Sequence, residues 1–285
     1  MSGITIYEVG PRDGLQNEKV MIPTARKIAL VDALTATGLR KIEVTSFVSP
    51  KWVPQLADAE DVIAGIKRAP SVDYSVLTPN RKGMEKAIAA GANEVAIFAS
   101  ASEGFSQRNI NCTIAESLER FAPVMRLAAE AGIPVRGYVS CVVECPYDGA
   151  VSPDDVSWVA RRLSEMGCHE ISLGDTIGRA TPETLRPMLQ AVLKEIPADR
   201  LAGHFHDTSR TALSSVATAL DLGIRCFDSA VGGLGGCPYA PGAKGNLATG
   251  ALIDFLEGQG IATGVDRDAL ARAEALLSQV GMSVV

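Results

Sequence analysis

The chain has 285 residues, of which 47% are hydrophobic and 21% are charged, and its formal net charge is −6. It contains no block of five or more like charges, so we expect no nucleic-acid partner. No apolar run reaches the roughly 18 residues that span a bilayer, so we expect no membrane partner either.

One unit recurs along the chain: a glycine, a few small or polar residues, and a short run rich in β-branched residues. Its five copies are TGLRKIEVTS (37–46), AGANEVAIFA (90–99), AGIPVRGYVS (131–140), MGCHEISLGD (166–175) and LGIRCFDSAV (222–231). The glycine predicts the end of a helix, since the residue just past a helix favours a positive φ. The run that follows predicts a buried, apolar strand.

Helix signals precede these glycines. Apolar residues recur at three- and four-residue spacing over 113–131. The segments SPDD (152–155) and TPET (181–184) each combine a Ser or Thr N-cap with a Pro at the first helical position and acids in the first turn. These patterns predict amphipathic helices between the strands.

Eight strands are predicted in all, and a helical pattern follows each one. They lie at about 4–9, 41–47, 73–79, 94–100, 134–141, 170–176, 201–207 and 226–232. Eight unbroken β/α units predict a (β/α)8 TIM barrel rather than an open sheet. We therefore expect a single domain over 1–285, with the barrel over about 4–260 and an additional C-terminal helix over about 266–281.

Polar residues stand at the C-terminal ends of several strands, where TIM barrels carry their chemistry. They are Arg12 and Asp13 after strand 1, Glu43 on strand 2, Asp175 on strand 6, and His204 and His206 on strand 7. The two histidines share one strand face, and their Cβ atoms lie about 6.6 Å apart. They can converge on one metal ion, or form a hydrogen-bonded pair in the interior.

Two further residues complete a candidate metal site. Asp13 offers a carboxylate, because strands 1 and 7 are near neighbours in a closed barrel, and Asn246 offers an amide oxygen. Two nitrogen and two oxygen ligands suit Mg²⁺ or Mn²⁺. Two alternatives stay open: two histidines and an aspartate also describe Fe(II) sites, and two histidines with Cys237 would suit Zn²⁺.

Arg12 and Asp175 each have two interpretations. Arg12 either forms a structural ion pair with Glu43 or offers a fixed cation to a developing oxyanion or enolate. Glu43 would then orient either Arg12 or a water on the metal. Asp175 is either a base or the acceptor of the turn at 176–178. His169 precedes strand 6 and is interpreted as surface structure.

The stretch GGLGGCPYAPGAKGN (232–246) contains eight Gly or Pro residues and predicts neither helix nor strand. We interpret it as a hinged loop that brings Cys237 over the substrate while Asn246 stays on the metal. The other cysteines, at 112, 141, 145, 168 and 226, are interpreted as small buried hydrophobes. With no secretory pattern at the start, the sparse cysteines predict reduced thiols and a cytoplasmic location.

Five motifs together resemble the 3-hydroxy-3-methylglutaryl-CoA lyase family over residues 4 to 264. They are EVGPRDGLQNE (8–18), TSFVSPKWVPQ (45–55), ISLGDTIG (171–178), HFHDT (204–208) and GLGGCPYAPGAKGN (233–246). The related isopropylmalate and homocitrate synthases share Arg-Asp-Gly and His-x-His. They carry a charged Gly-Glu-Arg type of loop where this chain has Gly-Gly-Cys-Pro-Tyr.

The resemblance implies metal-dependent retro-Claisen cleavage of (S)-3-hydroxy-3-methylglutaryl-CoA to acetyl-CoA and acetoacetate, as in leucine catabolism and ketone-body formation. It implies Asp13, His204, His206 and Asn246 as metal ligands, Arg12 as the cation that stabilises the enolate, and Glu43 as its support. It implies Cys237, Asp175 and His204 as acid/base groups. We expect an acyl-CoA substrate and a homo-oligomer, a dimer.

Three alternatives to this function are kept. The first is a lyase for a related 3-hydroxy-3-alkylglutaryl-CoA with a longer side chain, because Ser209 and Arg210 stand where many relatives have a glycine. The second is a Claisen-type synthase of the isopropylmalate or homocitrate kind. The third, from another class, is a barrel that only binds CoA or metal.

Overall fold

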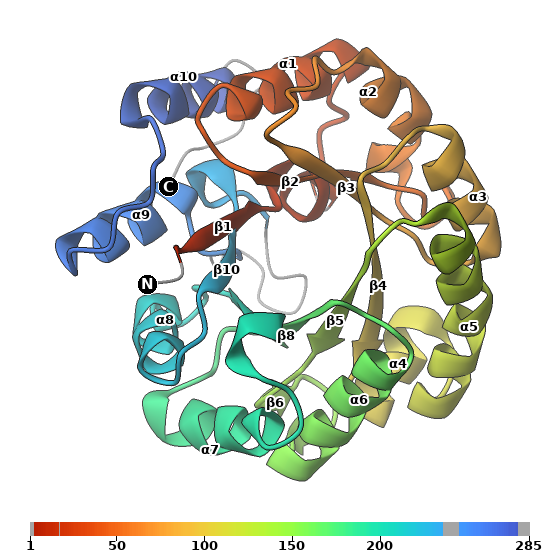
Figure 1. Ribbon diagram of the computed structural model, residues 1–285, viewed down its shortest axis with the longest axis vertical. Helices are drawn as coiled ribbons and strands as arrows, with labels where there is room; N and C mark the ends of the chain where they lie inside the picture. Colours follow the sequence, from red (N-terminus) through yellow and green to blue (C-terminus); the bar gives the residue numbers. More distant parts are fainter. Residues whose placement is uncertain (1–2, 17, 236–244, 279–285) are drawn as a thin grey trace.

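Eight parallel strands close into a barrel in a computed structural model that describes residues 3–16, 18–235 and 245–278 (Figure 1). The order around the barrel is β1-β10-β9-β8-β5-β4-β3-β2. The strands are β1 Thr5–Glu8, β2 Lys41–Ser46, β3 Asp73–Leu77, β4 Glu94–Ser100, β5 Val135–Ser140, β8 Glu170–Asp175, β9 Leu201–Phe205 and β10 Cys226–Ser229. The predicted TIM barrel is confirmed.

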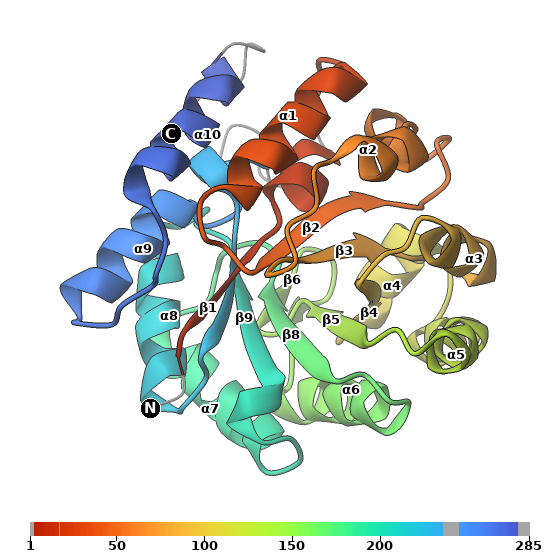
Figure 2. The ribbon, with the colours of Figure 1, turned by 45° about the horizontal axis from the view of Figure 1, so that its top comes forward.

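Helices surround the barrel on all sides, as Figures 1 and 2 show. They are α1 Thr24–Thr35, α2 Ala59–Gly65, α3 Arg81–Ala89, α4 Glu103–Ile110, α5 Ile114–Ala131, α6 Pro153–Glu165, α7 Pro182–Leu193, α8 Ala212–Asp221, α9 Thr249–Gly258 and α10 Arg267–Ser278. A small hairpin, β6 Glu144–Cys145 with β7 Gly149–Ala150, follows β5. Helix α10 is the predicted additional helix, and it packs against α1.

The predicted local signals form as expected. Thr113 and Thr181 close capping boxes at the starts of α5 and α7, and the Ser152 hydroxyl accepts the Asp154 N–H at the start of α6. All five glycines of the recurring unit take a positive φ: Gly38, Gly91, Gly132, Gly167 and Gly223. The last strand ends at Ser229, earlier than predicted, because Gly232 takes φ 61° in the 3-10 turn η4, Val231–Gly233.

The inside of the barrel is polar, which differs from the apolar strands that we predicted. Fully buried Arg136, Tyr7 and Asp228 lie there. The Tyr7 hydroxyl donates to Glu94 at 2.5 Å and Arg136 pairs with Asp228. The prediction of apolar strands holds only for the alternate residues of each strand, which face the helices. The other face builds a hydrogen-bonded network in place of the usual Val, Ile and Leu layers.

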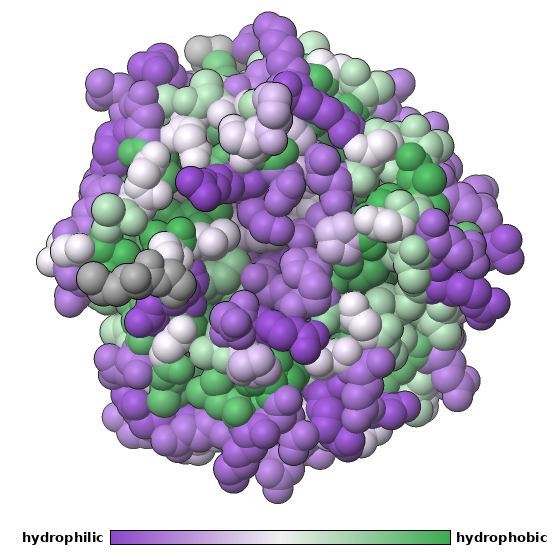
Figure 3. All heavy atoms as spheres, viewed as in Figure 1, coloured by the Kyte–Doolittle hydropathy of each residue, from purple (hydrophilic) through white to green (hydrophobic). Residues whose placement is uncertain are grey.

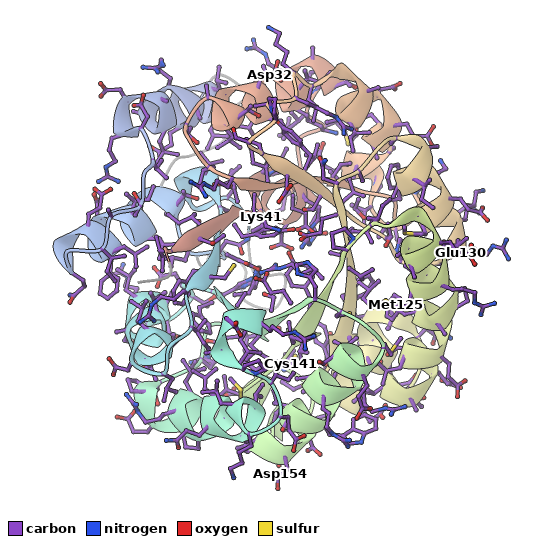
Figure 4. All side chains as sticks on the ribbon, viewed as in Figure 1. Asp32, Lys41, Met125, Glu130, Cys141 and Asp154 are labelled. Atoms are coloured by element: carbon purple, nitrogen blue, oxygen red, sulfur yellow. The ribbon has the colours of Figure 1, made fainter. Side chains whose placement is uncertain are left out.

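A charged cluster occupies the start of several strands. Glu94 accepts the Lys41 ammonium and the His169 ring, each at 2.8 Å. Figure 4 places Lys41 inside the ring of helices and Asp32 on its outside. Hydrophilic residues also cover the middle of the face seen in Figure 3. The His169 side chain is 39% exposed, as predicted for a surface residue, and it also holds the buried Glu94 carboxylate.

Glu8 is a fully buried carboxyl that ties the end of β1 to η4 and α9. Its Oε1 accepts the N–H groups of Gly10 and Val231, both at 2.8 Å, and its Oε2 accepts the Thr249 hydroxyl at 2.6 Å. Burial raises the pKa of Glu8 from 4.5 to about 7, although these three donors lower it. This carboxyl therefore fixes the backbone directly before Arg12 and Asp13.

Replacing Glu8 with Gln should reduce the loss of stability between pH 5 and pH 8. Since the folded pKa is the higher one, the proton stabilises the fold fully below about 4.5, and this contribution is lost as the pH rises through about 7. The neutral amide imitates the protonated acid. We expect similar Tm values at pH 5 and a Tm on the order of 5 °C above wild type at pH 8.

Calorimetry at a series of pH values measures this difference. The matched control is Glu130→Gln on the outside of α5, an exposed position that Figure 4 labels. Parallel Tm profiles for wild type and Glu8→Gln across this range would contradict the prediction.

Candidate active site

Arg12 and Asp13 lie in a single π-helical turn, η1, which spans Gly10–Gly14 directly after β1. The Val9 carbonyl accepts the N–H groups of Arg12, Asp13 and Gly14 at 2.8 to 3.2 Å. Such wide turns are rare and are often found at functional sites. The turn gathers an arginine and an aspartate at the carboxyl end of the first strand, where the sequence predicted them.

Arg12 is a buried cation held by two carboxylates. Its Nε donates to Glu43 and its Nη1 donates to Asp13, each at 2.6 Å, and its guanidinium lies 5.4 Å from the centre of the Tyr138 ring. Burial alone lowers the pKa of Arg12, but Glu43 and Asp13 raise it above its usual value. The ion pair with Glu43 is therefore present, and it fixes the direction of the cation.

His204 and His206 lie together with Asp13. The Nε2 atoms of the two histidines are 3.3 Å apart, and one ligand atom from each of the three residues falls within 4.8 Å of the others. Burial, followed by the nearby His204, lowers the pKa of His206 to about 4. His206 is therefore neutral at neutral pH, which is the form that binds metal.

Asn246 reaches this group from the far end of the chain. Its backbone pairs with His206 in an isolated β-bridge, and its Nδ2 donates to Asp13 Oδ2 at 2.7 Å. Burial raises the pKa of Asp13, but the Arg12 cation and other neighbours outweigh it and lower the pKa to about 2. The structure thus brings together all four predicted ligands.

This donor set fits a divalent cation. The carboxylate of Asp13 is ionised, His206 is neutral, and Nδ1 of His206 is buried without a hydrogen-bond partner among the described residues. Imidazole nitrogens with carboxylate and amide oxygens suit Mg²⁺ or Mn²⁺. The Fe(II) alternative uses the same three residues. The Zn²⁺ alternative needs Cys237, which lies outside the described residues.

Asp175 is not a member of the cluster of Asp13, His204 and His206, but its backbone carbonyl accepts the His206 N–H at 3.4 Å. Its Oδ1 accepts the Arg179 N–H at 3.0 Å and its Oδ2 accepts the Ala180 N–H at 2.8 Å. Burial raises its pKa. The carboxylate therefore holds the turn after β8 as an acceptor, as one of its two interpretations predicts, although the N–H groups that it accepts are those of Arg179 and Ala180, just beyond residues 176–178.

Sequence reasoning missed three side chains that contact the site. Asp228 accepts a hydrogen bond from the His204 ring, Arg136 holds Asp228, and the Tyr138 hydroxyl donates to Glu43 at 3.2 Å. The alternation of charged and apolar residues in VRGYV and CFDS contains the signal, since it places Arg136, Tyr138 and Asp228 on the inner face.

Five cysteines other than Cys237 were predicted to be buried, and the structure describes all five. Cys112, Cys141, Cys145, Cys168 and Cys226 are all buried and unpaired with one another as disulfides. Their burial is as predicted, but Cys145 is also a polar partner, since its Sγ accepts the Ser102 hydroxyl and the N–H groups of Tyr147 and Asp148. Among the described residues, no helix is long and apolar enough to cross a membrane.

Comparison with known proteins identifies close relatives. A family model described as HMGL-like matches residues 3–277. The mitochondrial hydroxymethylglutaryl-CoA lyase of Bos taurus is 57% identical over 276 residues, which are 97% of this chain and 85% of the relative. The 3-hydroxy-3-isohexenylglutaryl-CoA/hydroxy-methylglutaryl-CoA lyase of Pseudomonas aeruginosa is 57% identical over 95% of this chain and 90% of its own length.

Solved structures agree with the sequence matches. The crystal structure of the HMG-CoA lyase from Brucella melitensis has a TM-score of 0.97 and 57% identity, and the match covers 98% of this chain and 99% of that chain. The likeness therefore extends over the whole barrel and includes the strand ends that carry the site.

Proposed function

This chain belongs to the HMGL-like family, and we propose that it is a carbon–carbon lyase that cleaves (S)-3-hydroxy-3-methylglutaryl-CoA to acetyl-CoA and acetoacetate. The observation that carries the proposal is the convergence of Asp13, His204 and His206 beside the fixed cation of Arg12. An acyl-CoA is accordingly its substrate.

The metal site is proposed at Asp13, His204, His206 and Asn246, with Mg²⁺ or Mn²⁺ as the ion. When bound, such an ion polarises the tertiary hydroxyl of the substrate and lowers the pKa of that hydroxyl. The chain holds the ligands ready: Arg12 and Asn246 both donate to the Asp13 carboxylate, so its position is fixed before the substrate enters.

Arg12 is proposed to stabilise the negative charge that develops on the substrate. Loss of the hydroxyl proton to a base breaks the C–C bond, and the electron pair moves into the thioester fragment as an enolate. A buried guanidinium directed by Glu43 is a preorganised partner for that charge. Protonation of the enolate carbon then gives acetyl-CoA, and the other fragment is acetoacetate.

The proton transfers are assigned to His204, Asp175 and Cys237. His204 Nδ1 lies 3.0 Å from the Asp228 carboxylate, so only its Nε2 faces the site. That nitrogen cannot bind the ion and carry a proton at the same time, so proton transfer by His204 is the alternative to its role as a ligand. The raised pKa of Asp175 suits a group that takes up a proton, provided that its turn contacts loosen. Cys237 is proposed as the acid that protonates the enolate, although it lies outside the described residues.

Replacing Cys237 with Ala should lower kcat by about 10²- to 10⁴-fold, the usual range for losing a positioned acid or base. The Kd for Mn²⁺ should stay near the wild-type value, because the four proposed ligands remain. Steady-state kinetics and a metal titration measure the two quantities. Cys112→Ala, at a buried position outside the site, is the control. An unchanged kcat in Cys237→Ala would remove the thiol from the mechanism.

One assay separates the proposed function from its alternatives. The protein is incubated with 3-hydroxy-3-methylglutaryl-CoA, with and without Mg²⁺, and acetoacetate is measured. Metal-dependent release supports the lyase. Turnover of a 2-oxo acid with acetyl-CoA instead would indicate a synthase, and no turnover of either would favour a binding module.

A lyase for longer 3-hydroxy-3-alkylglutaryl-CoA esters is the second candidate. The Pseudomonas aeruginosa relative, 57% identical, is named for both an isohexenyl and a methyl substrate. Comparing kcat/KM for esters of increasing side-chain length tests it. Activity confined to the methyl ester would exclude this candidate.

We propose a cytoplasmic location and a homo-oligomeric assembly. The five described cysteines are free thiols, which suits the reducing cytoplasm. The proposed assembly is a dimer, and sedimentation of the purified protein tests it.

A further inference from the structure

We infer that Asp228 is a positioning residue that fixes His204 as the Nδ1–H tautomer and so turns the free Nε2 electron pair toward the metal site. The inference rests on the proposed metal site. It concerns a residue on β10, which lies between β9, the strand of His204, and β1, the strand that leads into the turn of Asp13.

The contact between the two side chains sets the tautomer. Asp228 Oδ2 lies 3.0 Å from His204 Nδ1, and the Asp228 side chain is completely buried. An ionised carboxylate can only accept hydrogen bonds, so the nitrogen that faces it must carry the proton. The other ring nitrogen, Nε2, then has a free electron pair, and it is the nitrogen that faces His206.

Three hydrogen bonds from two residues hold the Asp228 carboxylate in place. Arg136 donates to both of its oxygens, at 2.9 and 2.7 Å, and Ser172 donates to Oδ2 at 3.0 Å. A bidentate arginine keeps the carboxylate ionised and fixes its plane. Asp228 therefore cannot turn away from the His204 ring or offer it a proton.

Arg136 in turn is locked inside the barrel. Its side chain is fully buried, its Nε donates to Glu170 at 2.6 Å, and its guanidinium lies 4.0 Å from the centre of the Tyr7 ring and 4.9 Å from that of Tyr138. The orientation of His204 on β9 thus depends on the ion pairs that Arg136 of β5 forms with Asp228 and with Glu170 of β8.

The two histidines differ in this respect. His206 Nδ1 is buried and has no hydrogen-bond partner among the described residues, so no carboxylate fixes its ring. Metal-binding histidines usually donate their second N–H to such a partner, and losing that partner typically weakens metal binding 10- to 100-fold. We therefore expect His204, and not His206, to arrive at the metal site with its tautomer already set.

Nitrogen-15 NMR of the ion-free wild-type protein tests the tautomer without any substitution in the network. The chain has only three histidines, so His169→Ala and His206→Ala assign the signals by elimination. We expect the His204 ring to be protonated at Nδ1 and unprotonated at Nε2. Protonation at Nε2 in the wild-type protein would overturn the inference, whether or not any Asp228 variant folds.

Metal affinity provides the second readout. For Asp228→Ala we expect the Kd for Mn²⁺, measured by the EPR signal of the free ion, to rise about 10- to 100-fold. Asp228→Asn keeps an oxygen acceptor and should recover part of the affinity. Ser172→Ala is the matched control, since it removes a hydrogen bond to the same Asp228 oxygen and none to His204, and its Kd should stay within about 2-fold of wild type.

The outcomes separate this inference from the proposed function. A wild-type protein that binds no Mn²⁺ would contradict the metal site itself. A wild type that binds Mn²⁺, together with a folded Asp228→Ala variant of unchanged Kd, would overturn only the role of Asp228. If Asp228→Ala does not fold, the wild-type tautomer and the Asp228→Asn titration decide.

Discussion

Replacing Arg12 with Gln should lower kcat by about 10³-fold. The chain itself supplies the buried Arg12 guanidinium as a positive charge beside the proposed metal ligand Asp13. Ion pairs with Glu43 and Asp13 fix this charge before any substrate arrives. Removing one preorganised donor to a developing anion typically costs 10²- to 10³-fold in kcat, and charged donors contribute more than neutral ones. Because the stabilised charge exists only in the transition state, KM should change much less than kcat.

A matched variant separates this charge from the support of the metal ligand. Gln16 Nε2 also donates to Asp13 Oδ1, at 2.8 Å, but it carries no charge. If Arg12 acted only by holding Asp13, Gln16→Ala would reproduce much of its effect. We expect Gln16→Ala to lose far less activity, and Arg12→Lys to recover only part of it, because an ammonium cannot reproduce the guanidinium fork. Equal losses in Arg12→Gln and Gln16→Ala would contradict a direct role for the cation.

The sequence predicted the barrel because its signals are local. Glycines such as Gly132 and caps such as Thr113 act within a few residues, so they can be read without knowing the fold. The rule that TIM barrels carry their chemistry at strand ends then located Asp13 and His206. Because eight β/α units close into a barrel, the order of the strands predicts that Asp13, His204 and His206 lie near one another.

The interior network could not be predicted in the same way. Asp228, Arg136 and Tyr138 lie in the middle of strands, where the β-branched run suggested an apolar core. Their contacts join positions 92 residues apart, as between Arg136 and Asp228, and such pairs depend on the closure of the barrel. Asp175 illustrates the converse: its place at a strand end was predicted, but only the structure shows that both carboxylate oxygens are taken by backbone N–H groups.

Replacing His206 with Ala should raise the Kd for Mn²⁺ by more than about 100-fold. The loss of a direct ligand costs more than the 10- to 100-fold that is typical of losing a ligand's supporting partner. The substitution spares the rest of the site, because Asn246 pairs with the backbone of residue 206 and His204 is held independently by Asp228. A loss of affinity would therefore reflect the missing imidazole rather than a rearranged loop.

His169→Ala provides the control for removing an imidazole from this chain. That ring bonds Glu94, whose hydrogen bonds to Lys41 and Tyr7 place it at the starts of the strands, away from the metal group. Its removal should leave the Mn²⁺ titration unchanged. A normal titration in His206→Ala would exclude His206 from the ligand set. The same titration of the wild-type protein with Mg²⁺, Fe(II) and Zn²⁺ ranks the alternative ions by their Kd values, and His206→Ala should weaken the binding of each.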